Sequence, residues 1–310
     1  MTAVADPFVH PALFYRDEQE YLAGTVPFVR EAVEAGEPVA VAVPGENLRL
    51  IQDGLGDAAA AVRFLDMRQA GRNPGRIIPG VLRAFADTQP PGLRVRIIGE
   101  PIWAGRTETE YPACVQHEAL INAAFQGREV TILCPYDVQR LDEQVLTDAL
   151  ATHPTLITSG APLGQASGAY DPDGIVSGYN RPLPPAPDVM TLAFDTVTLP
   201  GARYHATAEG TRLGLTGTRL DDLSLITAEL TTNSVVHGGG VGELRVWAED
   251  GYVVCEVRDG GRLEDPLAGR RPAPHEQRGG RGLLLVNLIA DLVRVHTDAA
   301  GTTIRVFLAP

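Results

Sequence analysis

A proline-rich segment divides the chain into two parts whose residue patterns predict different folds. Four of the last six residues of 181–187 are prolines. Prolines lack an amide donor and hold the backbone extended, so the segment is typical of a semi-rigid linker. A chain of 310 residues is long enough for two domains. We expect one domain over residues 8–180, a linker over 181–188 and a second domain over 189–310.

The first part alternates short β-branched runs with longer helical patterns, which predicts a parallel α/β sheet. Strands are expected over residues 38–43, 62–66, 93–98 and 130–134, and helices over 19–35, 46–55, 76–86, 109–126 and 143–152. Polar clusters follow three of these strands, at 66–74, 99–103 and 134–137. Ligand sites in parallel sheets lie at the carboxyl ends of strands.

The second part predicts an α+β sandwich with an antiparallel sheet. A helix is expected over residues 202–213, and a longer one over 219–237 with Thr218 and Asp221 as its cap pair. A hairpin follows over 243–258, where Asp250-Gly251 forms the turn. A loop rich in glycine and arginine over 260–282 leads into a helix over 283–289 and two strands over 292–296 and 302–308.

Charge and composition exclude several classes of protein. The formal charge is −13, which argues against direct nucleic-acid binding, since phosphate contacts need clustered positive charge. All 26 basic residues are arginines, so a Walker-A loop, a pyridoxal Schiff base and a eukaryotic-type kinase lysine are excluded. No long apolar run, signal-peptide pattern or Cys-x-x-Cys pair occurs. We expect a cytoplasmic protein without a membrane span.

Three fragments of the second part form a constellation suited to a nucleotide. Glu229, Asn233 and His237 fall at i, i+4 and i+8 of the long helix, and oxygen ligands one turn apart suit Mg²⁺. Asp259-Gly-Gly261 ends a strand, where a carboxylate can accept a hydrogen bond from an exocyclic amine. The stretch 279–282, Gly-Gly-Arg-Gly, opens a helix whose amides favour an anion. Each fragment alone is commonplace, but their order and context are specific.

These fragments resemble the ATP-binding domain of histidine kinases, gyrase-like ATPases and anti-sigma-factor kinases, the GHKL or Bergerat fold. The stretch 229–238 resembles the N box, 259–261 the first glycine box and 279–282 the second. A short lid and Asp-Asp-Leu over 221–223 are similar to the serine-kinase and anti-sigma branch. Leu263 stands where the first glycine box usually has a second glycine, and this departure concerns the geometry of the lid.

The resemblance implies a role for each matching residue. Asn233 coordinates the Mg²⁺ that bridges ATP phosphates, Asp259 receives the adenine amino group, and Glu229 is the general base for an attacking hydroxyl. Gly261 gives the base room, and Thr303 lies near the adenine. Gly280, Arg281 and Gly282 hold phosphate. His237 either lines the site or packs behind it. ATP and Mg²⁺ are the implied cofactors.

The first part resembles the sensory domain called MEDS, known from regulators of methanogens and methylotrophs and joined to anti-sigma-type ATPases in actinobacteria. The resemblance covers about residues 8–180 and is carried by the stretches 10–16, 71–74, 99–103, 117–120 and 134–137. It implies a degenerate RecA-like fold that senses a small molecule. Trp103 and Tyr136 either line a ligand pocket or belong to the core.

A metal site in the first part is a further alternative. Cys114 and His117 are one turn apart on a predicted helix, with Glu118 next and Cys134 elsewhere. Structural zinc sites usually show tighter paired spacings. The competing interpretation is a set of buried cysteines beside a hydrogen-bonded histidine.

Taken together, the two resemblances imply a signalling regulator that controls sigma-factor partner switching. It acts as an anti-sigma factor, as a serine/threonine kinase of an anti-sigma-factor antagonist of the STAS type, or as both. About 30 residues between the linker and the N-box helix are too few for the dimerisation hairpin of a histidine kinase, and His205 belongs to the domain's first helix. The alternatives are an ATP-binding interaction protein without phosphotransfer and an atypical histidine-kinase-like protein. Family analogy suggests a homodimer.

Overall fold

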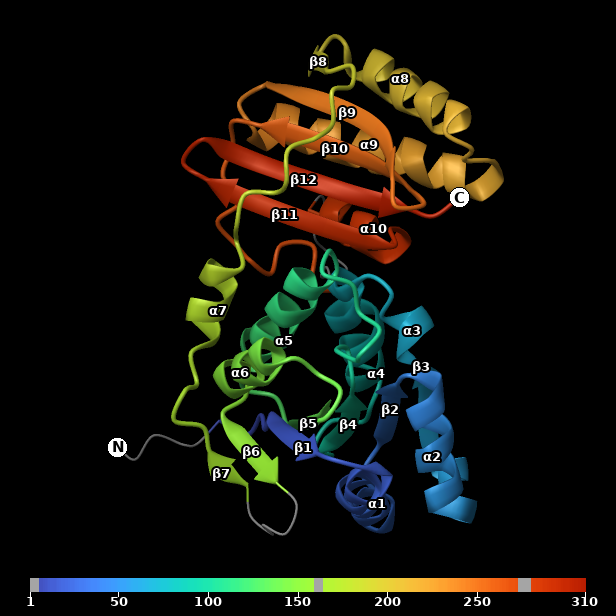
Figure 1. Ribbon diagram of the computed structural model, residues 1–310, viewed down its shortest axis with the longest axis vertical. Helices are drawn as coiled ribbons and strands as arrows, with labels where there is room; N and C mark the ends of the chain where they lie inside the picture. Colours follow the sequence, from blue (N-terminus) through green and yellow to red (C-terminus); the bar gives the residue numbers. More distant parts are fainter. Residues whose placement is uncertain (1–5, 159–163, 273–279) are drawn as a thin grey trace. The chain divides into compact units, whose positions relative to one another are not determined.

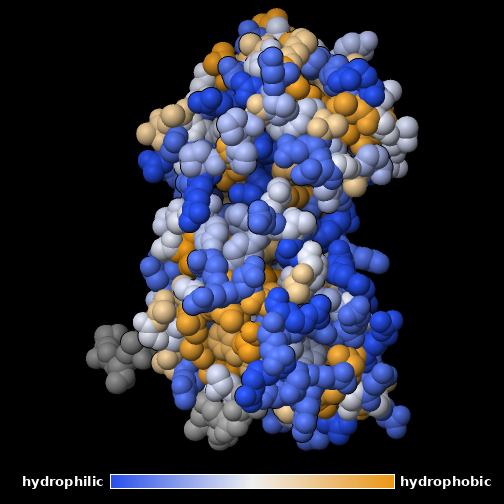
Figure 2. All heavy atoms as spheres, viewed as in Figure 1, coloured by the Kyte–Doolittle hydropathy of each residue, from blue (hydrophilic) through white to orange (hydrophobic). Residues whose placement is uncertain are grey.

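A computed structural model of the chain describes residues 6–158, 164–272 and 280–310. The chain separates into two compact units, Met1–Tyr179 and Asn180–Pro310. Every helix in the described ranges is too short or too polar to cross a membrane. Hydrophilic side chains cover most of the visible face of both units, and apolar side chains gather in one patch on the first (Figure 2).

The first unit is an α/β domain built on a seven-stranded sheet of order β3-β2-β4-β5-β1-β6-β7 (Figure 1). All neighbouring strands are parallel except β6 and β7. The strands are β1 (Pro11–Tyr15), β2 (Val39–Val43), β3 (Val62–Asp66), β4 (Val95–Gly99), β5 (Val130–Asp137), β6 (Thr155–Thr158) and β7 (Gln165–Ala166). The helices are α1 (Glu18–Glu34), α2 (Gly45–Leu55), α3 (Met67–Ala70), α4 (Arg83–Ala86), α5 (Tyr111–Phe125), α6 (Glu143–Thr152) and α7 (Pro172–Gly178).

Strand β2 shows why this sheet is buried on both faces. All five of its residues are buried, which is typical of parallel strands covered by helices on both sides. Its valines, at 39, 41 and 43, pack with α1 and α2 in one apolar cluster that includes Val29 and Ile51. The helices α5 and α6 lie on the other side of the sheet in Figure 1. The predicted parallel α/β fold is confirmed.

The helix predicted over residues 76–86 is interrupted. Its residues form a 3₁₀ turn (Pro74–Arg76), a π-helical turn (Ile78–Leu82) and the short α4. Pro79 lies in the π turn and has no N–H to continue the helical ladder, which accounts for the irregularity. The strands β1, β6 and β7 and the helices α3 and α7 are additional to the predicted elements.

The second unit is an α+β sandwich with a five-stranded antiparallel sheet of order β11-β12-β10-β9-β8. The strands are β8 (Leu192–Asp195), β9 (Val241–Glu249), β10 (Tyr252–Asp259), β11 (Leu292–Asp298) and β12 (Gly301–Leu308). The helices α8 (Leu199–Arg212), α9 (Gly217–His237) and α10 (Gly282–Ile289) lie together on one face of the sheet (Figure 1). The predicted fold class of this part is confirmed.

The core of the second unit lies between this helical layer and the sheet. Leu223, Ile226 and Leu230 repeat at helical spacing along α9 and are at most 1% exposed. They pack against inward side chains of β10 and β12, such as Cys255 and Val306. Full burial of one such aliphatic side chain contributes about 1.5–3 kcal/mol. This packing fixes the face of α9 that carries Asn233.

One local feature of the second unit differs from the sequence predictions. The Thr218–Asp221 cap pair is wrong, because α9 begins at Gly217 and its N-cap is Thr216, which makes no side-chain cap hydrogen bond. In the proline-rich segment, the Pro184 carbonyl oxygen accepts a hydrogen bond from Arg305 Nη2 at 2.8 Å, on the outer face of the sheet. Arg305 is held in place by a buried pair with Glu256, at 2.6 Å.

Candidate functional site

The second unit contains a cavity of about 660 Å³ between α9, the end of β10, the start of α10 and β12. Small-molecule sites usually measure about 300–1,000 Å³. Six of the nine predicted site residues line it, namely Asn233, His237, Asp259, Gly261, Gly280 and Gly282. Glu229, Arg281 and Thr303 are not among its lining residues.

Asp259 is held in a fixed orientation at the end of β10. Its Oδ2 accepts a hydrogen bond from Ser234 Oγ at 2.6 Å, and its Oδ1 accepts one from the Gly261 amide at 2.8 Å. A side chain on Gly238 would collide with the Asp259 carboxyl group, and a Cβ on Gly261 would lie 2.7 Å from the Gly238 Cα. Glycine is therefore required at both positions because helix end and loop approach each other closely.

A relay of hydroxyl groups fixes the loop that follows β10. The Leu263 amide donates to Thr297 Oγ1 at 3.0 Å, and the hydroxyls of Thr297 and Thr302 lie 2.8 Å apart. Thr302 Oγ1 donates to the Gly261 carbonyl oxygen at 2.9 Å. Because that carbonyl can only accept, the Thr297 hydroxyl is the donor to Thr302. The relay ties the first glycine box to β11 and β12.

The structure corrects the prediction for Thr303. Thr302 lines the cavity, whereas Thr303 lines a separate hollow on the outer face of the sheet, beside Pro184 and Arg305. Successive strand residues point to opposite faces. The predicted residue and the residue that lines the cavity are neighbours on β12, and a shift of one residue along a strand reverses the face.

The three predicted site residues on α9 do not all line the cavity. Asn233 and the exposed His237 line the cavity. Glu229 points instead toward the start of α10, where a side chain on Gly282 would collide with its carboxylate and would lie 3.4 Å from Asn233 Nδ2. The N box and the second glycine box are therefore in direct contact. This contact places a carboxylate and an amide side by side at the amino end of α10.

The second glycine box opens α10. Gly280 has a φ of 73°, a left-handed conformation that favours glycine. Arg281 is the exposed N-cap residue, and Gly282 begins the helix. The first amides of a helix have no partner within the helix itself, which makes a helix start of this kind suited to an anion. Gly279 lies outside the described residues.

Three contributors to the cavity were not anticipated from the sequence. Ser234 orients Asp259, Thr302 anchors the loop, and Leu263 forms part of the wall. Ser234 could have been considered a candidate from the sequence, since it directly follows Asn233 on the same helix. Thr302 could have been identified from strand alternation, because Ile304 and Val306 on the same strand belong to the core.

The first unit has its own pocket, of about 210 Å³, at the carboxyl ends of its parallel strands. It is lined by Glu100, Trp103 and Asp137 from the predicted polar clusters, together with Asn47. Burial raises the pKa of Glu100 to about 8, while both of its oxygens lie 2.9 Å from Asn47 Nδ2. Tyr136 does not line the pocket and is 2% exposed. Trp103 is thus the pocket residue of the two aromatic candidates.

Comparison with known proteins agrees with this division. Residues 9–154 match the family described as "MEDS: MEthanogen/methylotroph, DcmR Sensory domain", and residues 192–308 match the family described as "Histidine kinase-like ATPase domain". The chain is also 30% identical over 114 residues to an anti-sigma F factor from Geobacillus stearothermophilus, which covers 33% of this chain and 78% of that protein. The chain belongs to the histidine kinase-like ATPase family. Its ATPase domain follows a MEDS domain.

Both resemblances inferred from the motifs are thereby confirmed. The histidine kinase-like ATPase domain covers every residue of the cavity, since the lining residues fall between Asn233 and Ile304. A domain of this family implies ATP binding, and small-molecule ligands usually bind in concave sites.

Proposed function

We propose that the histidine kinase-like ATPase domain binds Mg-ATP in the 660 Å³ cavity and that the chain uses this nucleotide to control a sigma-factor partner-switching module. The observation that carries the proposal is the convergence of Asn233, Asp259 and the amino end of α10 on one cavity. The anti-sigma F factor relative supports the regulatory part. In this proposal the chain sequesters a sigma factor, phosphorylates a hydroxyl on an antagonist protein, or does both.

The residues around the cavity fit an adenine nucleotide. Asp259, held by Ser234 and the Gly261 amide, retains acceptor capacity for an exocyclic amine. Gly238 and Gly261 let the end of α9 and the loop after β10 pack closely together, which holds Asp259 at the cavity. Asn233 would hold Mg²⁺ through its amide oxygen, and the ion would neutralise phosphate charge when bound. The first turn of α10, with Gly280 and Gly282, would hold phosphate through backbone amides.

The proposed transfer step uses Glu229 as the general base. The Glu229 carboxylate accepts the proton of a serine or threonine hydroxyl on the partner. The hydroxyl oxygen forms a bond to the γ-phosphorus, the bond to the bridging oxygen breaks, and ADP leaves. The position of Glu229 beside Gly282 and Asn233, next to the proposed phosphate site, supports this role. In the same proposal, a small molecule in the MEDS domain biases the ATPase domain.

Calorimetry with Mg-ATP tests the nucleotide site. The parent chain is expected to give one binding event, and Asn233→Ala is expected to weaken it about 10- to 100-fold, because a ligand to a charged group is lost. Thr232→Ala, at the exposed neighbouring position of the same helix, is the matched control and should bind like the parent. Absence of heat with both ATP and ADP at saturating Mg²⁺ would refute the proposal.

A pair of substitutions on β12 tests the assignment of Thr302 to the cavity. Thr302→Val keeps the shape of the side chain but removes the hydroxyl that holds the Gly261 carbonyl, so nucleotide affinity should fall about five- to tenfold. Thr303→Val, on the opposite face of the strand, should leave the affinity unchanged. Equal affinities of the two variants would contradict the assignment.

The second candidate function is binding without transfer, in which ATP acts as a structural ligand. Incubation with γ-labelled ATP and a candidate antagonist separates the two functions, since label reaches the partner only if transfer occurs. A pull-down from native lysate with and without ATP would identify the partner. An atypical histidine kinase is disfavoured, because residues 188–216 contain β8 and α8, which both pack into the ATPase domain and leave no two-helix hairpin in that described range.

A further inference from the structure

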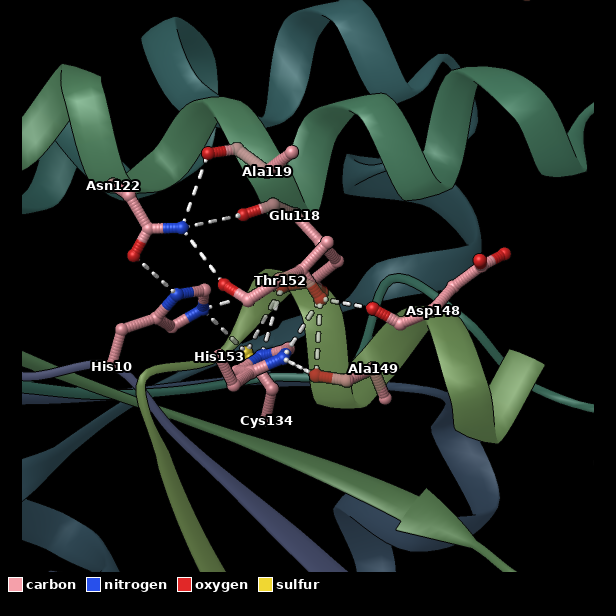
Figure 3. A network of polar contacts seen from close by, with 9 residues as sticks. All are labelled: His10, Glu118, Ala119, Asn122, Cys134, Asp148, Ala149, Thr152 and His153. Atoms are coloured by element: carbon pink, nitrogen blue, oxygen red, sulfur yellow. Dashed lines mark hydrogen bonds and ion pairs between the residues drawn. The ribbon is translucent and has the colours of Figure 1, made fainter. Parts of the chain in front are cut away.

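Four metal-ligating side chains meet in the interior of the MEDS domain (Figure 3). His10 precedes β1, Glu118 lies on α5, Cys134 lies on β5 and His153 directly follows α6. None of the four is more than 1% exposed. Their ligand atoms all lie within 4.8 Å of one another. The group is separate from the proposed nucleotide site, which lies in the other domain.

The strand order brings these distant residues together. Strand β1 lies between β5 and β6, with Ala12 paired to Cys134 and Pro11 paired to Thr155. The segment before β1, the middle of β5 and the end of α6 are therefore neighbours across the sheet. Glu118 extends from α5 to the same point and is fully buried.

Hydrogen bonds fix the protonated nitrogen of His10. Asn122 Nδ2 donates to the carbonyl oxygens of Thr152, at 2.8 Å, and Ala119, at 3.1 Å. This orientation leaves Asn122 Oδ1 as an acceptor, 3.2 Å from His10 Nδ1. The proton of His10 is therefore on Nδ1, and the lone pair on Nε2 faces the group.

His153 has the same arrangement. Its Nδ1 lies 2.9 Å from the Ala149 carbonyl oxygen and 3.0 Å from Thr152 Oγ1, whose own proton is donated to Asp148 O. Both neighbours accept, so Nδ1 carries the proton and Nε2 presents a lone pair. In a metal-bound histidine, the ring nitrogen that does not bind the metal usually donates its proton to an oxygen acceptor of this kind.

The interior of the group has more acceptors than donors. Two imidazole lone pairs face the Glu118 carboxylate, and the Cys134 thiol is the one donor that the four side chains direct into the group, because both histidine Nδ1 protons point away from it. No described residue makes a hydrogen bond to His153 Nε2 or to Glu118 Oε1, although His153 Nε2 is only 3.4 Å from Glu118 Oε2. Each buried polar atom left without a partner costs about 1–3 kcal/mol. A cation at the centre of the group would give both imidazole lone pairs, the carboxylate and the sulfur a common partner.

The spacing of the donor atoms matches a tetrahedral zinc site. Glu118 Oε2 lies 3.3 Å from His10 Nε2, 3.4 Å from His153 Nε2 and 3.5 Å from Cys134 Sγ. Cys134 Sγ lies 3.4 Å from His10 Nε2, which gives four of the six edges, and all four ligand atoms lie within 4.8 Å of one another. Zinc bonds of about 2.0–2.3 Å place tetrahedral ligands about 3.3–3.8 Å apart. The four distances therefore correspond to edges of such a tetrahedron.

We propose that His10, Glu118, Cys134 and His153 bind one zinc-class divalent transition-metal ion as a closed, four-coordinate site. Two neutral imidazoles, a thiolate and a carboxylate balance the charge of a divalent ion, so the interior gains no net charge. Nitrogen and sulfur donors favour zinc over magnesium or calcium. Binding releases the thiol proton and links β1, α5, β5 and the end of α6. Cys114 and His117, considered from the sequence, lie outside this group.

Metal analysis of the full chain tests the site. The chain is purified without a metal-affinity tag from zinc-supplemented medium and dialysed, and its metal content is measured by mass spectrometry. The parent should hold about one zinc ion per chain. Cys134→Ser should hold much less, whereas Cys114→Ser, which alters another buried cysteine of the same domain, should hold as much as the parent. Cobalt reconstitution should give a thiolate-to-cobalt charge-transfer band in the parent and in Cys114→Ser but not in Cys134→Ser.

Circular dichroism establishes whether each variant is folded, and His153→Gln is the second variant if Cys134→Ser fails to fold. A chelator should lower the melting temperature of the parent more than that of the folded variant, because metal binding to the native state contributes to stability. A parent chain that holds no more zinc or cobalt than the variant, with no effect of the chelator, would overturn the proposal. The group would then be a metal-free hydrogen-bonded cluster. Nucleotide binding in the other domain is unaffected by either outcome.

Discussion

Replacement of Glu229 by glutamine is expected to lower phosphoryl transfer to a partner hydroxyl about 10²–10⁴-fold, the contribution typical of a general base. The affinity for Mg-ATP should change by less than about twofold, because Glu229 is not among the residues that line the cavity. The prediction rests on the proposed function. Initial rates of label transfer from γ-labelled ATP to the antagonist protein measure the first quantity, and calorimetry measures the second.

The choice of glutamine follows from the packing around Glu229. Its carboxylate lies against Gly282 and near Asn233, so truncation to alanine would also leave a gap beside α10. Glutamine keeps the shape and removes the basic oxygen. Glu209→Gln, at a half-buried carboxylate of α8 paired with Arg212, is the matched control and should transfer like the parent. Transfer by Glu229→Gln at the parent rate, with a partner that the parent phosphorylates, would exclude Glu229 as the base.

Local patterns were sufficient to predict most of the second domain. The helical spacing of Leu223, Ile226 and Leu230 located α9 and its buried face. The Asp250-Gly251 dipeptide located the β9–β10 hairpin, and both residues have positive φ, at 49° and 82°, as a type I′ turn requires. These signals depend only on residues that are close together in the sequence, so they can be interpreted without knowing which distant segments come into contact.

The parts that could not be predicted depend on register and on contacts between distant segments. Thr302 and Thr303 are adjacent, and a shift of one residue exchanges the cavity for the outer face of the sheet. His10 and His153 have no common spacing motif with Cys134, because the order β5-β1-β6 alone brings the three together. A sequence shows which residues could act as ligands, but the sheet order decides which of them meet.

Glu100 gives the MEDS domain an expected dependence of stability on pH. The carboxyl group is 4% exposed, and burial raises its pKa to about 8, from an ordinary value of 4.5. Asn47 Nδ2 donates to both oxygens, and Tyr21 Oη donates to Oε2 at 3.3 Å, but these bonds offset only part of the effect of burial. Asp137 reinforces the raised pKa, and the exposed Arg140 opposes it. Burial also raises the pKa of the neighbouring Tyr21, with Glu100 adding to that rise.

The sign of the effect follows from proton binding in the two states. Between pH 4.5 and about 8, Glu100 keeps its proton in the folded domain and loses it in the unfolded chain. The folded state therefore binds more protons, and the free energy of unfolding falls as the pH rises. The stabilising contribution is complete below pH 4.5 and is lost by about pH 8. The largest slope is about 1.4 kcal/mol per pH unit, so the total over the window is on the order of a few kcal/mol.

Glu100→Gln removes the titration while keeping an acceptor and the shape of the side chain. Relative to this variant, the parent should lose up to about 1.4 kcal/mol of unfolding free energy for each pH unit between 5 and 8. Urea unfolding followed by Trp103 fluorescence reports the MEDS domain when both chains carry Trp247→Phe, because these are the two tryptophans. Glu46→Gln, at an exposed carboxyl of the same pocket, should follow the parent at every pH. Parallel curves for the parent and Glu100→Gln would mean that Glu100 is ionised in the folded domain, and hence that the pocket at the end of the parallel strands presents a carboxylate to its ligand.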